Sequence, residues 1–167
     1  MMLIAFDSGI ERTGYAVFNL HESRYTVQAY GCIITPKVST LPVRIATLHD
    51  KVEELISQYR PDVFIIERLF FTMNKKTAIT VAQAQGAVLR LAGHHGIEVE
   101  FLTPNQIKQA ITGYGNADKK SVQQMVALML ELEEAPKYDD TTDALACGLT
   151  YCTMKALHDR QAQGANS

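Results

Sequence analysis

Aspartates gather at one point in the last third of the sequence. The stretch YDDTTDALACGLT, residues 138–150, places Asp139, Asp140 and Asp143 at the head of a run of small, mostly apolar residues. Acids favour a helix start, because they cap free backbone N–H groups and interact well with the positive end of the helix dipole. One or two acids are enough for that role. Residues three or four apart share one helix face, so Asp143 can act together with either Asp140 or Asp139.

Two further acids, Asp7 and Glu67, end apolar runs that are typical of strands. In open α/β sheets the functional crevice lies at the carboxyl ends of parallel strands, so these carboxylates converge if the two strands are neighbours. Like charges held close together raise a pKa and cost free energy unless a cation lies between them. Together with Asp140 and Asp143, the two acids predict a site for divalent metal ions, and carboxylate oxygens suit Mg²⁺.

The elements that must position these acids follow from the residue pattern. We expect three strands with short links, forming an antiparallel meander, at 2–7, 13–20 and 24–35. Two later strands are expected at 63–67 and 97–103, the first of them covered on both faces. Helical spacing and end signals predict helices at 39–59, 77–96, 104–112, 119–132 and 141–160. The sequence is therefore that of an α/β protein.

Composition restricts the class of protein. A chain of 167 residues, 47% of them apolar, is long enough for one domain with a substantial core. No apolar run approaches the ~18 residues that a membrane span needs, and we expect a cytoplasmic protein with no membrane partner. Three cysteines without a CxxC pair argue against a disulfide framework and against a thiolate zinc site. The net charge of −2 means that any nucleic acid must be held locally.

Four motifs, taken in order and at their spacings, resemble the RuvC family of Holliday junction resolvases. They are DSGIERTGYAVF from residue 7, IIERLFF from residue 65, IKQAITGYGNADKKSVQ from residue 107 and DDTTDALACGLTYC from residue 139. The resemblance extends from Leu3 to about Lys155. It implies a ribonuclease H-like fold, with a five-stranded mixed sheet of three antiparallel N-terminal strands and then parallel strands, flanked by helices. Residues 1–158 are then a single nuclease domain, and 159–167 are expected to be a flexible tail.

The resemblance also implies the activity and its cofactor. It implies a homodimer that cuts four-way DNA junctions and leaves 5′-phosphate and 3′-hydroxyl ends. The implied cofactor is Mg²⁺, with two ions per active site, and Mn²⁺ can substitute for it. The metal-binding and catalytic acids map onto Asp7, Glu67, Asp140 and Asp143, and two catalytic lysines map onto Lys108 and Lys119. The choice of Asp140 over Asp139 rests on the family pattern D-x-x-D-A-L-A, which leaves Asp139 to cap the helix or to tune the site.

Contacts to DNA are expected around the second motif. The family's junction-contacting aromatic maps onto Phe70, with Phe71 beside it, and the stretch ERLFFTMNKK interleaves aromatic and basic residues in a way that suits stacking on unpaired bases. The full set of candidate DNA contacts is Arg68, Phe70, Phe71, Lys75, Lys76 and Lys120. A branch-migration motor complex is a further candidate partner. A line of small residues, Ala78, Ala82 and Gly86, would let a partner helix approach closely.

Two positions depart from the family pattern, and three other functions compete. Ser8 stands where the family usually has proline, and Gln85 stands where an arginine usually precedes the glycine. An actin-like or sugar-kinase ATPase shares the D-x-G hairpin but needs a second one, which this chain lacks. A junction-binding protein that does not cut would lack the acid set. A ribonuclease H that acts on RNA–DNA hybrids shares the acids, and only substrate assays separate it from a resolvase.

Overall fold

The computed structural model describes residues 1–68 and 75–164 and centres on a five-stranded sheet. Its strands are β1 (Met2–Asp7), β2 (Arg12–His21), β3 (Arg24–Ile34), β4 (Val63–Glu67) and β5 (Glu98–Leu102). They lie in the order β3-β2-β1-β4-β5. The first three strands pair antiparallel, whereas β1 with β4 and β4 with β5 pair parallel. The mixed α/β sheet expected from the sequence is confirmed.

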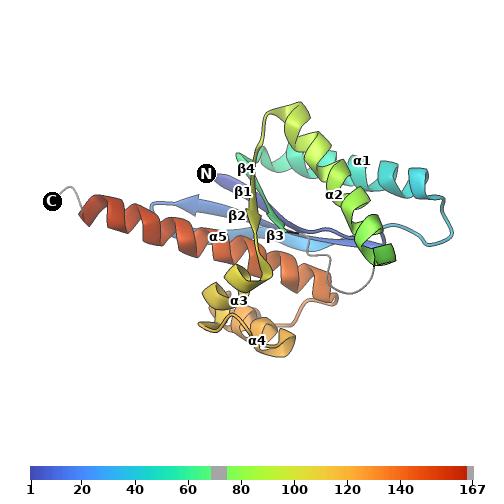
Figure 1. Cartoon of the computed structure of the whole chain (residues 1–167). Coiled ribbons are helices and arrows are strands. Elements are labelled where there is room, and N and C mark those ends of the chain that lie inside the picture. Colours follow the sequence, from blue (N-terminus) through green and yellow to red (C-terminus); the bar gives the residue numbers. More distant parts are fainter. Residues whose placement is uncertain (69–74, 165–167) are drawn as a thin grey trace.

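Helices cover both faces of this sheet (Figure 1). They are α1 (Leu41–Tyr59), α2 (Lys75–His95), α3 (Pro104–Thr112), α4 (Lys119–Met129) and α5 (Asp139–Gly164). The pair α1 and α2 lies on one face, α5 crosses the other, and α3 and α4 lie beside the first half of α5 (Figure 1). Helix α5 continues past the domain boundary expected at residue 158.

The two central strands alternate their side chains between two cores. Leu3 and Ala5 of β1 join the core that contains Leu145 and Leu149 of α5. Their neighbours Ile4 and Phe6 join the core under α1 and α2 instead. The same alternation holds in β4, where positions 63 and 65 face α5 and positions 64 and 66 face away. Because side chains alternate with a period of two, the next residues, Asp7 and Glu67, are directed to the α5 side.

Two glycines let α5 lie close to the sheet. A Cβ atom on Gly14 of β2 would overlap the backbone carbonyl oxygen of Asp140. A Cβ atom on Gly148 of α5 would overlap the ring of Phe18. These contacts set the height of α5 above β1 and β2, and therefore the position of its acidic first turn.

The end of helix α4 differs from the sequence expectation for a reason that the backbone makes clear. Helix α4 stops at Met129 and not at residue 132, because Glu131 adopts a positive φ of 50° and the backbone N–H of Leu132 donates to the carbonyl of Ala127. The left-handed residue closes the helix in the manner of a C-terminal cap. No helix in the described residues is long and apolar enough to cross a membrane.

Candidate active site

Asp7 and Glu67 meet at the carboxyl edge of the sheet. Phe6 lies opposite Ile66 in the parallel pairing of β1 with β4, so the two acids follow side by side. Burial, and then the charges of Asp143, Glu67 and Asp140, raise the pKa of Asp7 to about 7. Burial and the charge of Asp143 also raise the pKa of Glu67. The carboxylates predicted from the sequence therefore act electrostatically on one another.

The other two acids come from the first turn of α5, which the glycine contacts hold against β2. Asp140 and Asp143 are three residues apart and share a helix face. The side chains are 21% and 29% exposed, respectively. Burial raises the pKa of Asp143, and the hydrogen bond and charge of Lys119 oppose that rise. The acid pair of α5 thus faces the acid pair of the sheet.

Two cations contact the acids of α5. Lys119 Nζ donates to Asp143 Oδ2 at 2.9 Å and lies 3.4 Å from Asp139 Oδ2. Arg12 Nε lies 2.9 Å from Asp140 Oδ2. In the described part of the chain, no three His, Cys, Asp or Glu side chains stand close enough together to enclose a metal ion. Asp140 and Asp143 are instead paired with Arg12 and Lys119, respectively.

The donor set nevertheless fits a hard divalent cation. Asp7 and Glu67 are carboxylates whose charged forms are disfavoured by burial and by their neighbours, and a bound cation would offset both effects. Asp140 Oδ2 is buried and accepts no hydrogen bond from any described residue, although Arg12 is close. Asp7, Glu67, Asp140 and Asp143 offer the oxygen ligands that such an ion prefers.

Two lysines line a pocket beside these acids. The pocket has a volume of about 280 Å³ and is walled by Glu67, Asp143, Lys108 of α3 and Lys119 of α4. Its remaining lining residues are Pro104, Ile107, Val122 and Ala146. Lys108 and Lys119 both act to lower the pKa of Glu67, against the larger effect of its burial. The structure thus brings both sequence-predicted lysines to the acids.

The remaining sequence-predicted residues are spread around this region. Arg68 follows β4, where its backbone N–H donates to the carbonyl of Leu102 at 2.7 Å and its guanidinium lies 5.9 Å from the centre of the Phe101 ring. Lys120 is exposed in the first turn of α4. Lys75 and Lys76 begin the backbone of α2, and their side chains lie outside the description. Phe70 and Phe71 lie outside the described residues.

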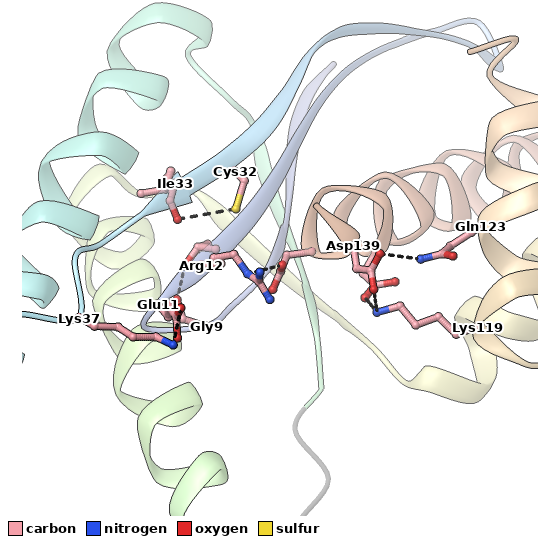
Figure 2. Close-up of polar contacts among 12 residues, drawn as sticks. Gly9, Glu11, Arg12, Cys32, Ile33, Lys37, Lys119, Gln123 and Asp139 are labelled. Atoms are coloured by element: carbon pink, nitrogen blue, oxygen red, sulfur yellow. Dashed lines mark hydrogen bonds and ion pairs between the residues drawn. The ribbon is translucent and has the colours of Figure 1, made fainter. Parts of the chain in front are cut away.

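At three residues of the site the structure shows contacts that the sequence did not predict. Gln85 of α2 is buried, and its Nε2 donates to the backbone oxygen of Glu67 at 3.1 Å, so it supports the end of β4. Asp139 accepts a hydrogen bond from Gln123 Nε2 at 3.1 Å, which ties α4 to α5 (Figure 2). The third residue is Arg12, which contacts Asp140. Its position within the first motif was the only sign in the sequence that it belongs to the site. Ser8, a departure from the family pattern, is buried, and its Oγ has no hydrogen-bond partner among the described residues.

Comparison with known proteins gives consistent matches along almost the whole chain. The family profile described as "Crossover junction endodeoxyribonuclease RuvC" matches residues 3–151. The protein of that name from Alkaliphilus oremlandii is 40% identical over 151 residues, which are 90% of this chain and 92% of that protein. The one from Caldanaerobacter subterraneus subsp. tengcongensis is 38% identical over 164 residues, 98% of this chain and 99% of that protein.

Solved structures show the same fold. Thermus thermophilus RuvC is 30% identical, with a TM-score of 0.85, and the match covers 95% of this chain and 97% of that one. T. thermophilus RuvC in complex with Holliday junction substrate is 28% identical, with a TM-score of 0.83 and coverage of 94% and 96%.

Proposed function

The chain belongs to the RuvC family of crossover junction endodeoxyribonucleases, and from this premise we propose that it resolves four-way (Holliday) DNA junctions by paired, symmetric nicks. The enzyme is an endodeoxyribonuclease of a family of metal-dependent nucleases. The observation that supports this function most directly is the convergence of four acids at one edge of the sheet, two from the ends of β1 and β4 and two from the first turn of α5.

In this proposal Asp7, Glu67, Asp140 and Asp143 hold two Mg²⁺ ions, with Mn²⁺ as a substitute. When bound, the ions supply activation of the attacking water and stabilisation of the leaving oxygen. The protein's own part is to fix the ligands: β1 and β4 hold two acids rigidly at the end of buried strands, and α5 holds the other two. We assign residues 1–158 to a single nuclease domain, and α5 continues from it to Gly164.

Lys108 and Lys119 bind the scissile phosphate in the proposed complex. Both line the pocket that contains Glu67 and Asp143, so a phosphate at this place meets two positive charges on one side and the acids on the other. Fixed positive charges of this kind stabilise the charge that develops on the phosphate in the transition state. Arg68, Lys75, Lys76 and Lys120 make weaker, sequence-independent contacts to other phosphates.

We assign junction recognition to the segment between β4 and α2 and to a second copy of the chain. We assign stacking on displaced bases to Phe70, with Phe71 as the alternative. Two equivalent sites are needed for symmetric nicks across a four-way junction, and a two-fold homodimer provides them. The exposed line of α2 that contains Ala82 and Gly86 is the proposed contact. A branch-migration motor complex remains a candidate partner.

Cleavage of synthetic substrates tests this function. Purified protein is incubated with Mg²⁺ and a labelled four-way junction, beside a linear duplex and an RNA–DNA hybrid of the same sequence. The expected result is cutting of the junction at symmetric positions on two opposing strands, with the duplex and the hybrid intact. Preferential cutting of the hybrid would identify a ribonuclease H instead. Tight junction binding without cutting in either Mg²⁺ or Mn²⁺ would identify a binding protein.

A further inference from the structure

Arg12 begins β2 directly beside the first turn of α5. Its Nε lies 2.9 Å from Asp140 Oδ2, and its guanidinium carbon lies 5.7 Å from the centre of the Tyr138 ring. Figure 2 shows Arg12 extending from the strand toward the helix that starts at Asp139. A positively charged side chain is therefore paired with a carboxylate that the proposed function assigns as a metal ligand.

The contact differs from a strong structural ion pair. An arginine that holds a carboxylate firmly usually makes two parallel, well-aligned hydrogen bonds. Here Arg12 approaches Asp140 Oδ2 through Nε, and that buried oxygen accepts no hydrogen bond among the described residues. The guanidinium thus supplies charge without a directed N–H, and 47% of its side chain is exposed. Water can solvate the guanidinium when it leaves, so the contact is suited to exchange.

We propose that Arg12 is an internal counter-ion, which occupies Asp140 in the metal-free protein and competes with the divalent ion for that carboxylate. This inference rests on the proposed function, because it takes Asp140 as a metal ligand. Arg12 is a positioning residue, since it acts through Asp140. In the metal-free state it reduces the repulsion among the four acids, and during loading it sets the concentration of metal that the site needs.

The direction of the effect separates this role from ordinary structural support. Removal of a merely structural residue would disturb the acids and weaken metal binding. Removal of a competing charge strengthens metal binding. Because 47% of the Arg12 side chain is exposed, the energy of the pair is modest, and we expect roughly a two- to tenfold gain in affinity. The Tyr138 ring holds the guanidinium by a cation–π contact, so loss of the ring should act in the same direction as loss of Arg12.

The test is a titration with Mn²⁺ alone, without DNA, followed by the electron paramagnetic resonance signal of the free ion at low ionic strength. The variants are Arg12→Gln, Arg12→Lys and Tyr138→Leu. The matched control is Lys37→Gln, because Lys37 Nζ pairs with Glu11 Oε1 at 3.0 Å and is 73% exposed. The control removes the same charge from a nearby segment without touching the acids.

The expected result is tighter Mn²⁺ binding by Arg12→Gln and, to a smaller extent, by Tyr138→Leu. Arg12→Lys, which keeps the charge, and Lys37→Gln should both bind within about twofold of wild type. Thermal melting with chelator present should show a lower Tm for Arg12→Gln, and Mn²⁺ should raise that Tm by more than it raises the wild-type value. Unchanged or weaker Mn²⁺ binding by both Arg12→Gln and Tyr138→Leu, with wild-type binding intact, overturns the role of Arg12 and leaves the proposed function standing. A wild-type protein that binds no Mn²⁺ overturns both.

Discussion

At the scale of single residues, Asp139 and Asp140 are neighbours with different surroundings. Asp140 is 21% exposed, lies over Gly14 and contributes to the raised pKa of Asp7. Asp139 is 68% exposed and binds Lys119 and Gln123 on α4. The physical surroundings therefore favour Asp140 as the metal ligand, which the sequence alone could choose only through a family pattern.

We predict that Asp140→Asn lowers junction cutting by at least about 100-fold, because loss of a ligand weakens the metal site. Junction binding should be retained, since repulsion of the phosphates falls. Asp139→Asn is the matched control and should lose less than about fivefold, the loss of one exposed contact. Cleavage rates and gel-shift affinities of the two variants check this. An active Asp140→Asn enzyme beside an inactive Asp139→Asn enzyme would reverse the assignment.

The raised pKa of Asp7 predicts an unusual pH dependence of stability. The pKa of Asp7 is about 7 in the folded protein, against 3.8 for the ordinary side chain. Asp7 therefore stays protonated to a higher pH in the folded state than in the unfolded state. As a result, the metal-free protein loses stability as the pH rises from about 4 to about 7. Asp7→Asn lacks this penalty, so at about pH 8 it should be more stable than wild type by up to roughly 4 kcal/mol, with little difference below about pH 4.

Urea unfolding with chelator at both pH values measures the effect. Addition of Mg²⁺ at the higher pH should stabilise the wild type and reduce the difference in stability between it and Asp7→Asn, because the bound metal replaces the proton on Asp7. A variant that is less stable than wild type at about pH 8 would show that Asp7 contributes to folding in some other way.

Several residues show what the sequence could and could not reveal. The acids at the ends of two apolar runs predicted that Asp7 and Glu67 converge if their strands are neighbours, and the pairing of β1 with β4 meets that condition. The contacts of Arg12 with Asp140, and of Gln85 with the backbone of Glu67, join residues far apart in the sequence. They depend on how closely α5 and α2 approach the sheet, and no local pattern encodes that distance. The roles of Phe70 and Phe71 stay predictions.

At the scale of elements, α5 positions half of the acids, and its height above the sheet depends on Gly14 and Gly148. The antiparallel pairing of the first three strands was predicted from apolar runs and short links, whereas the parallel strands were expected from the family resemblance. The end of α4 was not, because it depends on the positive φ of Glu131, a residue type that rarely adopts it. Both glycines were present in the first and last motifs. Only the packed structure shows that one lies against a backbone carbonyl and the other against an aromatic ring.

We predict that Gly148→Ala destabilises the protein by about 1–3 kcal/mol, because the added methyl group would overlap the Phe18 ring in a filled core. It should also weaken Mn²⁺ binding, since α5 must lift away from β1. Gly93→Ala in α2 is the control: a Cβ there meets nothing within 4 Å, and the change should stabilise the helix by about 0.5–1 kcal/mol. Chemical denaturation and Mn²⁺ titration test both. If Gly148→Ala were as stable as the wild type, the close contact at Gly148 would not be what positions α5.

At the scale of the whole molecule, the active site and the proposed dimer contact lie on different elements. The acids lie on the side of the sheet that α5 covers. The outer side of α2, on the opposite side, exposes Ile79 (58%), Ala82 and Gly86. A Cβ on Gly86 would meet nothing within 4 Å, so we expect a larger side chain there to extend into open space without disturbing the protomer. Paired cutting can therefore be separated from chemistry by a single substitution.

We predict that Gly86→Arg gives a folded monomer that still binds Mn²⁺ but no longer cuts both strands of a junction together. The matched control is Ser57→Arg, on the exposed surface of α1, which should remain dimeric. Analytical ultracentrifugation with and without junction DNA, and a supercoiled cruciform substrate that distinguishes one nick from two, give the measurements. A dimeric Gly86→Arg protein would place the interface elsewhere. A wild type that stays monomeric on junction DNA would contradict paired cutting.

The acids that meet at the sheet edge come from residue 7, residue 67 and the first turn of α5. During synthesis on the ribosome, β1 to β4 emerge first, and N-terminal segments begin to fold before the rest is made. The emerging chain holds only two of its four acids until α5 has been added. A polypeptide released before residue 140 therefore carries Lys108 and Lys119, and it lacks two of the four carboxylates that we propose as metal ligands. The order of the motifs along the chain therefore makes the completion of α5 the step on which the proposed cutting of DNA depends.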